Sequence, residues 1–193
     1  MALQTNLVAA WNCQGNSGGT TIVDVISNVV LTLAGGATLS ATGLVCNAIN
    51  HRAFVATPAA LQLVLPLTIA VYLDILGTPS SNANYFGATN NNNDASPFVG
   101  YQVSMATTFY QEGWNTAGTY VGLNSVTAPA VGDKQTLFMV FKNGLHNLYL
   151  NGSSIVSDAV AQSNPTYAAT TELSLGAQSN SAHTNANATF RAA

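Results

Sequence analysis

The amino-acid sequence predicts an all-β protein built from antiparallel strands. Its clearest segment, residues 137–158, consists of three apolar runs separated by two Asn-Gly pairs, Asn143-Gly144 and Asn151-Gly152. Asn-Gly favours the two-residue type I′ turn, because both central residues of that turn need positive φ. Within the runs, apolar side chains alternate with others, which is the two-residue repeat of a strand. We therefore expect a three-stranded antiparallel meander here, with the four Asn and Gly residues at its turns.

Further apolar and β-branched segments follow one another along the rest of the chain. The strongest is 67–76, LTIAVYLDIL, in which Asp74 alone interrupts the apolar run and either points outward or is buried with a partner. We expect one helical turn within residues 59–65 and a long polar loop over residues 77–97. Trp114 is expected in a turn. The other expected strands are residues 21–33, 43–49, 54–55, 98–105, 107–111, 119–123, 171–177 and 188–193. No repeat or linker divides the chain, so residues 1–193 read as one domain.

Several spaced motifs resemble the LamG-like jelly rolls of the concanavalin A-like lectin/glucanase group. In the meander, LYLNG at residues 148–152 and SIV at residues 154–156 are similar to two consecutive strands of that family. The opening LVAAW at residues 7–11, the glycine-rich loop after it, Asp24 and TELSLGA at residues 171–177 also match its layout. Asn12, Cys13 and Gln14 stand where the family often carries acidic residues. The resemblance implies a single concanavalin A-like jelly-roll β-sandwich.

Composition excludes several classes of function. Only 6% of the 193 residues are charged, against about 25% in typical globular proteins. The net charge is −3 and the basic residues are Arg52, Lys134, Lys142 and Arg191. Phosphate binding needs clustered Lys and Arg, so a nucleic-acid partner is disfavoured. No apolar run reaches the roughly 18 residues of a membrane span, so no membrane insertion is expected.

The cysteines and the N-terminus bear on the compartment. A disulfide between Cys13 and Cys46 is left open by the sequence, but two small buried apolar side chains are the better interpretation. The opening MALQTNLVAAW lacks the basic start and long apolar core of a secretion signal. We therefore expect a protein that reaches the outside without a signal peptide, as a phage structural protein does on lysis.

The titratable residues do not predict catalysis. Glycoside hydrolysis needs a pair of carboxylates about 5 to 9.5 Å apart. No two of the seven carboxylates lie within three residues of each other; they are Asp24, Asp74, Asp94, Glu112, Asp133, Asp158 and Glu172. His51, His146 and His183 are scattered, with His146 expected on a sheet face, and no spacing resembles a zinc site. We therefore expect no enzyme, no catalytic residue and no required cofactor.

Binding residues are sought instead among the aromatic side chains of the central segments. Aromatic rings offer flat apolar surfaces for stacking while their polar tips stay hydrated. The candidates are Tyr85, Tyr101, Tyr110, Trp114 and Tyr120. The preferred interpretation is that most of them are core or interface residues. The loop from Asn90 to Asp94 offers side-chain oxygens that could hold Ca²⁺, with Asp94 as its one carboxylate, although that single carboxylate favours a plain polar loop.

These observations lead to two hypotheses about function and one about assembly. The first is a non-enzymatic virion surface protein, a capsid decoration or tail-associated module that contacts other virion proteins or copies of itself. The alternative is a glycan-binding domain of a secreted or cell-surface protein. The low charge indicates either an assembled protein or an extracellular domain with a Thr/Asn-rich face. We also expect the short C-terminal segment, residues 189–193, to close its sheet poorly, and either this segment or a face rich in Thr and Ala to lie in a contact with a partner.

Overall fold

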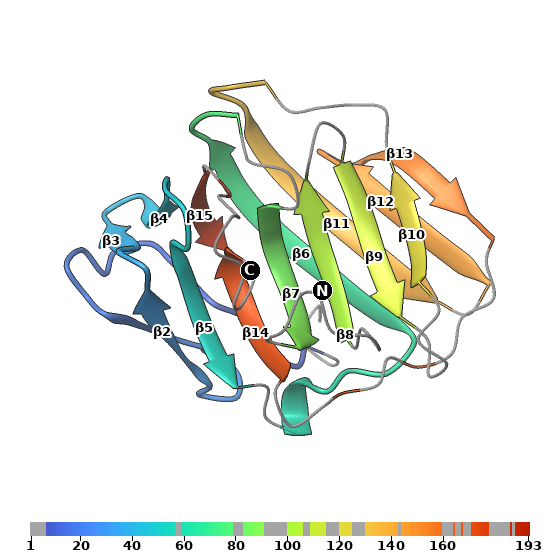
Figure 1. Cartoon of the computed structure of the whole chain (residues 1–193), viewed down its shortest axis with the longest axis horizontal. Coiled ribbons are helices and arrows are strands. Elements are labelled where there is room, and N and C mark those ends of the chain that lie inside the picture. The colour runs from blue at the N-terminus through green and yellow to red at the C-terminus, as the bar shows by residue number, and fades with distance from the viewer. Residues whose placement is uncertain are drawn as a thin grey trace, which may run out of the picture.

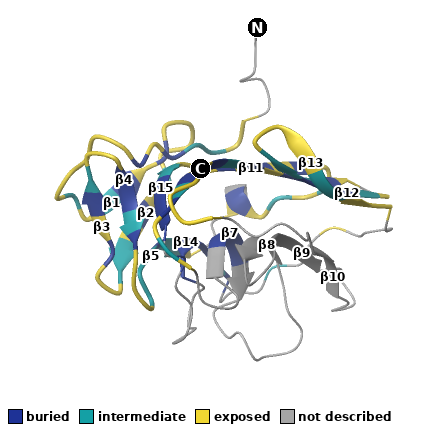
Figure 2. Cartoon of the chain, turned by 90° about the horizontal axis from the view of Figure 1, so that it is seen from above, coloured by how far each residue is buried: buried dark blue, intermediate teal, exposed yellow. Residues whose placement is uncertain are grey.

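The computed structural model describes most of the chain. It covers residues 7–56, 59–78, 83–90, 100–105, 109–114, 120–124, 130–142, 144–159, 164, 167, 171–177, 186 and 188–193. Two antiparallel sheets lie one above the other as a sandwich (Figures 1 and 2). The described residues thus form an all-β jelly-roll sandwich, and the predicted fold class is confirmed.

The first sheet has eight strands and the second has seven. In spatial order, the eight-stranded sheet comprises β1 (Thr21–Val23), β2 (Val30–Ala34), β5 (Arg52–Ala56), β14 (Thr171–Gly176), β7 (Ala83–Asn90), β8 (Gly100–Met105), β9 (Phe109–Trp114) and β10 (Tyr120–Asn124). The seven-stranded sheet comprises β13 (Ser153–Asp158), β12 (Leu145–Leu150), β11 (Lys134–Lys142), β6 (Leu67–Ile75), β15 (Ala188–Ala192), β4 (Gly43–Cys46) and β3 (Thr38–Ser40). The one helical element among the described residues is the turn η1 (Ala59–Leu61), which fits the expected helical turn. No described helix is long and apolar enough to cross a membrane.

Alternation along β6 shows how the sequence builds the core. Its odd-numbered residues from Leu67 to Ile75 are buried, whereas Thr68, Ala70 and Tyr72 are exposed on the outer face. The same repeat in β11 buries Leu137, Met139 and Phe141. Because successive strand side chains point to opposite faces, each sheet contributes one apolar face to the interior. Leu173 and Leu175 of β14 supply fully buried side chains from the opposite sheet.

The predicted meander is confirmed. β11 pairs with β12 and β12 pairs with β13, both antiparallel. Gly144 has φ +73°, and the second turn places Asn151 at φ +50° and Gly152 at φ +84°. Two consecutive positive φ values are what a type I′ turn requires. Asn143 lies outside the described residues.

Two segments of the eight-stranded sheet differ from prediction. The region predicted as one polar loop contains β7, which pairs with β14 and with β8. β7 reads ANYFGATN, with few β-branched or large apolar residues, so its strand character comes from pairing on both edges rather than from propensity. Residues 21–33 form two strands, β1 and β2, because buried Asp24 accepts hydrogen bonds from the N–H groups of Ile26 (3.0 Å) and Ser27 (2.5 Å) in the turn between them. Trp114, predicted in a turn, is the last residue of β9.

The C-terminal strand also lies elsewhere than predicted. β15 is an interior strand, paired with β4 on one edge and β6 on the other. Phe190 is fully buried. Gly43, at φ +145°, permits the close approach of β4, since a Cβ at that position would lie 2.1 Å from the carbonyl oxygen of Phe190. The C-terminal strand is therefore not the poorly closed edge that the sequence predicts.

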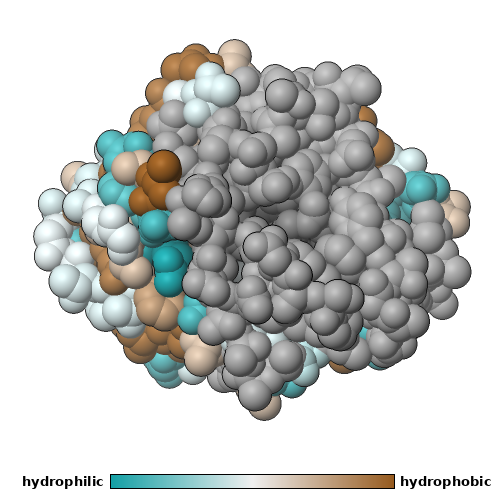
Figure 3. Space-filling view, viewed as in Figure 1, coloured by the Kyte–Doolittle hydropathy of each residue, from teal (hydrophilic) through white to brown (hydrophobic). Residues whose placement is uncertain are grey.

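The surface and the cysteines agree with the composition. In Figure 3 the described end of the molecule around β2 and β5 mixes pale and hydrophobic residues with a smaller number of hydrophilic ones. Cys13 and Cys46 are both buried and unbonded, which confirms the interpretation as small buried side chains. Burial raises the pKa of the Cys13 thiol to about 12 and raises that of Cys46 further.

Candidate ligand-binding faces

The five predicted ligand-binding aromatic residues separate into three groups. Tyr85 is fully buried, and its ring meets that of Phe190 edge-on with 6.1 Å between centroids. Burial raises the pKa of its phenol well above the ordinary value. Tyr85 is therefore a core residue in this structure, and the prediction that it contacts a ligand at the surface is corrected. Tyr85 lies in the core because its strand, β7, is an interior strand of the sheet, flanked by β14 and β8.

Backbone register places three of the other four aromatic residues in one phase of the sheet. Tyr120 pairs with Trp114, and Tyr110 lies four residues before Trp114 on the same strand, so all three positions share a face. Tyr101 pairs with Gly113 on one side and with Ala88 on the other, in the same row as buried Leu173. It therefore lies in the opposite phase. Register thus brings Tyr110, Trp114 and Tyr120 to the β9–β10 end of the eight-stranded sheet, at positions of one phase.

A second group of aromatic residues, not predicted from the sequence, lies on the outer face of the seven-stranded sheet. Phe138 of β11 is directly opposite Tyr149 of β12 and pairs on its other side with Ala70, two residues before Tyr72. Tyr72 is 36% exposed and Phe138 is 38% exposed, whereas Tyr149 is half-buried. We call these three residues, one on each of three adjacent strands, the aromatic row.

Polar side chains hold the β12 end of the aromatic row in place. The amide nitrogen of Asn147 donates a hydrogen bond to the hydroxyl oxygen of Tyr149 (2.9 Å). The hydroxyl of Ser154 in turn donates to the amide oxygen of Asn147 (2.7 Å). The row therefore ends in hydroxyl and amide groups of the kind that hydrogen-bond polar ligands.

An ion pair borders the opposite end of the row. The guanidinium of Arg191 donates from Nε to Asp74 Oδ1 (3.0 Å) and from Nη2 to Asp74 Oδ2 (2.5 Å). The hydrogen bond to Asp74 raises the pKa of Arg191 above its ordinary value. The same guanidinium lies 5.6 Å from the centroid of the Tyr72 ring. Asp74 thus points outward with a partner, and its charge neutralises Arg191 beside the row.

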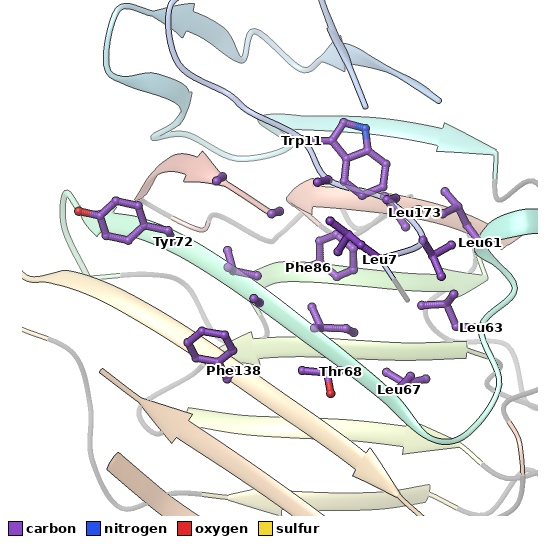
Figure 4. A pocket seen from close by; sticks show the side chains of 18 of the residues that line it. Leu7, Trp11, Leu61, Leu63, Leu67, Thr68, Tyr72, Phe86, Phe138 and Leu173 are labelled. Carbon is purple, nitrogen blue, oxygen red and sulfur yellow. The ribbon is translucent and has the colours of Figure 1, made fainter. Parts of the chain in front are cut away.

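An apolar groove of about 800 Å³ runs beside β6. Figure 4 shows Tyr72, Thr68 and Phe138 on the strands that border it, with Leu7, Leu61 and Leu63 across from them. Trp11, Phe86 and Leu173 line its inner part. The groove therefore extends from the aromatic row toward the sandwich interior.

The aromatic row has a signal in the sequence that could have revealed it. In both β6 and β11, Tyr72 and Phe138 occupy the phase opposite to the buried Leu, Ile, Val and Met side chains. A large aromatic residue in the polar phase of an alternating strand indicates an exposed ring. What the sequence alone does not show is the register that aligns the two strands and adds Tyr149.

Two of the described carboxylates accept hydrogen bonds from neighbouring groups. Burial opposes ionisation of Asp24, yet hydrogen bonds from Ala10, Ser27 and Ile26 hold its pKa below the ordinary value. Asp133 accepts from the N–H of Ala130 and from the side chain of Gln135. No group of three His, Cys, Asp or Glu side chains within the described part could hold a metal ion. Asp94, the candidate Ca²⁺ ligand, lies outside it.

Comparison with known proteins gives the fold. No family model and no curated protein matches the chain. The binding domain of Paraclostridial Mosquitocidal Protein 1 is similar at TM-score 0.66 and 13% identity, over 96% of this chain and 49% of that chain. A Trypanosoma rangeli sialidase in complex with 2,3-difluorosialic acid matches at TM-score 0.64 and 15% identity, over 95% of this chain and 29% of that one. The Ruminococcus gnavus IT-sialidase CBM40, bound to α2,3-sialyllactose, matches at TM-score 0.59 and 13% identity, over 77% and 86%.

These similarities establish a β-sandwich shared with known binding domains. This chain spans about half of the mosquitocidal binding domain and less than a third of the sialidase. In the comparison with the CBM40 structure, most of both chains is matched. At these identities the fold is shared, and function must be argued from the faces described above.

Proposed function

We propose that this chain is a non-enzymatic glycan-binding β-sandwich whose binding platform is the aromatic row. The observation that carries the proposal is the exposure of Tyr72 and Phe138 beside half-buried Tyr149 on three adjacent strands. Adjacent strands lie about 4.8 Å apart, so the row offers successive flat rings to successive units of an extended ligand. Rings of this kind stack on the apolar faces of sugars while polar groups at the rim bind hydroxyls.

The charge beside the row favours a neutral oligosaccharide. Arg191 is the cation next to Tyr72, and both oxygens of Asp74 engage it. A carboxylate-bearing sugar would have to compete with Asp74 for that guanidinium. The hydroxyl and amide groups of Tyr149, Asn147 and Ser154 need no charged partner. The fold shared with the CBM40 module supports glycan binding in general and leaves the sugar to be decided by these residues.

The β9–β10 end of the eight-stranded sheet is the second candidate platform. It is favoured by the register that puts Tyr110, Trp114 and Tyr120 in one phase. The virion-surface hypothesis, with other virion proteins as partners, has no comparable observation and stays a prediction. Glycan binding is the function that the described faces support better.

A binding screen tests the proposal. Purified protein is applied to an array of neutral and sialylated oligosaccharides, and each hit is titrated by calorimetry. Phe138→Ala and Tyr72→Ala should each weaken binding by about tenfold or more, with far-UV circular dichroism unchanged. Val131→Ala, at an exposed apolar residue outside the row, is the matched control and should bind normally.

The outcomes separate the two platforms. Loss of binding in Trp114→Ala, with the row variants unaffected, would move the site to the eight-stranded sheet. An array without any binding would reject glycan recognition itself. Turnover of a bound oligosaccharide would overturn the non-enzymatic part of the proposal.

A further inference from the structure

Within the described part of the chain, one flank of β6 lacks a strand partner over half its length. On one side β11 pairs with β6 from Leu67 to Asp74. On the other side β15 pairs only with Tyr72 to Ile75. Among the described residues no strand lies against Leu67–Val71 on this side, although β6 is an interior strand of the sheet. An unpaired strand edge presents free N–H and C=O groups that can pair with another chain.

The backbone of the neighbouring residues shows which groups face the gap. Ala193 exchanges both of its backbone hydrogen bonds with Trp11, at 2.6 and 3.1 Å, so these groups point away from β6. Ala192, the partner of Tyr72, then directs its own groups toward β6, because backbone groups alternate sides along a strand. By the same alternation, Ala70 and Thr68 direct their N–H and C=O groups into the gap.

The gap coincides with the apolar groove. Residues 7–10, residues 61–64 and Pro66 also line it. Leu67, Ile69 and Val71 of β6 contribute inward-facing side chains, as do Phe86 and Leu173 from the other sheet. On the outer side, by contrast, the exposed residues along this part of β6 are Thr68 and Ala70. A strand placed here would thus meet an apolar interior on one face and small or polar residues on the other.

We propose that this groove is a docking slot for an extended strand supplied by another polypeptide. The strand runs antiparallel to β6, in line with β15, and pairs with the backbone of Ala70 and Thr68. Its apolar side chains lie opposite Val71, Ile69 and Leu67, and its small or polar side chains lie opposite Ala70 and Thr68. This is β-strand addition, in which the main chain supplies affinity and alternate side chains supply specificity.

The backbone groups of Ala70 and Thr68, which no described strand pairs on this side, decide between a strand and a small apolar ligand. An acyl chain or similar molecule would fill the apolar part of the groove but would leave Ala70 and Thr68 without hydrogen-bond partners. Buried backbone groups are almost always paired, and an unpaired one costs about 1 to 3 kcal/mol. A strand fills the apolar part of the groove and also pairs with the backbone groups of Ala70 and Thr68. The slot lies on the side of β6 opposite to β11, whereas the aromatic row borders the same groove on the outer face of the sheet.

The test uses a free peptide and a variant of the protein whose extended C-terminus is designed to fill the slot. The peptide is Lys-Thr-Val-Thr-Leu-Thr-Val-Thr-Lys with a fluorescent label, and its control has the same composition with the Thr residues in one block. The blocking variant adds Thr-Leu-Thr-Val after Ala193, which places Leu opposite Ile69 and Val opposite Leu67. The matched control adds Leu-Thr-Val-Thr, which has the same composition with every side chain on the other face.

The expected result is binding of the alternating peptide, measured by fluorescence anisotropy, to the original chain and to the Leu-Thr-Val-Thr variant. Binding to the Thr-Leu-Thr-Val variant should be at least about tenfold weaker, and its melting temperature should be higher. Hydrogen exchange at residues 68 and 70 should slow when the peptide binds.

Other results would overturn the proposal. These are equal binding of the two peptides, or no difference between the two extensions. Displacement of the peptide by decanoate without any slowing of exchange would indicate an apolar ligand site instead. A dimer that the Thr-Leu-Thr-Val extension alone converts to monomer would identify a second copy of this chain as the occupant.

Discussion

His146 shows how one polar side chain is accommodated inside the meander. The sequence predicts it on a sheet face, and it lies on the inner face of β12, fully buried. Its ring meets Phe141 edge-on, with 5.0 Å between centroids. Burial lowers the pKa of His146 to about 4, and the nearby charge of Asp158 opposes part of that shift. The folded protein therefore holds this imidazole neutral.

The stability of the protein should depend on pH through this residue. In the unfolded chain His146 takes up a proton near the ordinary histidine pKa of 6.5, whereas the folded chain takes it up only near pH 4. The unfolded state thus binds more protons in this window, and the free energy of unfolding falls as pH drops from 6.5 to 4. The expected loss is on the order of 2 to 3 kcal/mol. Urea denaturation across this range should show a clearly smaller pH slope in His146→Phe, and an unchanged slope would contradict the assignment.

At the level of the element, the β12–β13 hairpin depends on its turn. Gly152 has φ +84°, and a Cβ built there would meet no atom within 4 Å. Any cost of substitution therefore comes from backbone conformation alone. A β-branched side chain at positive φ is strongly disfavoured, so Gly152→Val should destabilise the protein by about 1 to 2 kcal/mol or more.

A matched substitution separates turn geometry from side-chain size. Asn tolerates positive φ, as Asn151 already does in the same turn at φ +50°. Gly152→Asn should therefore cost clearly less than Gly152→Val. The measurement is the denaturation midpoint in urea for both variants. Equal midpoints for Gly152→Val and the unmodified protein would argue against a type I′ turn here.

The meander could be predicted because its signals are local. Alternation and the Asn-Gly pairs all lie within one short segment, residues 137–158, so they indicate both the strands and the turns. β7 and β15 could not be placed in this way. β7 is a strand because β14 and β8 hold both of its edges, and β15 is interior because β4 and β6 flank it. Pairing between residues far apart in the chain leaves no local pattern to find.

The grouping of the candidate binding residues also depends on pairing between residues far apart in the chain. Residue type alone marks aromatic residues as binding candidates, but register decides which of them share a face. It separates Tyr101 from Trp114, and it joins Tyr72, Phe138 and Tyr149, which come from three strands. The prediction for Tyr85 is wrong because its burial depends on the neighbours of β7. The sequence can thus nominate residues, whereas their grouping requires the sheet.

At the scale of the whole molecule, assembly with a partner stays a prediction, but the C-terminal strand no longer supports it. The low charge of the chain remains, and the C-terminal strand is not an open edge. The edge strands of the described sheets are β1, β10, β13 and β3. Among the described residues, the flank of β6 from Leu67 to Val71 has no strand partner opposite to β11. Any partner strand is therefore expected at β6 rather than at the chain terminus.

Trp11 lies where the two sheets meet, and its backbone contacts both the last residue of the sequence, Ala193, and a residue near its start, Asp24. Its backbone pairs with Ala193 beside β15 and forms a bridge with Asp24 after β1. Its side chain is 2% exposed, and the centroid of its ring lies 6.1 Å from that of Phe86 in the eight-stranded sheet. Its Nε1 donates a hydrogen bond to the carbonyl oxygen of Val29 (3.3 Å). Trp11 thus contacts elements of both layers.

Removing this side chain should weaken the sandwich as one unit. Trp11→Ala is expected to lower the free energy of unfolding by about 3 to 5 kcal/mol, because it leaves a large cavity between the sheets. Trp11→Phe keeps the ring contact and should cost less. In both variants Trp114, at the end of β9, is the only remaining tryptophan and reports from the far end of the eight-stranded sheet. Urea transitions followed by Trp114 fluorescence and by far-UV circular dichroism should coincide. Separate transitions, or a cost for Trp11→Ala that is well below the usual range for a large core residue, would show that the two sheets do not depend on this contact.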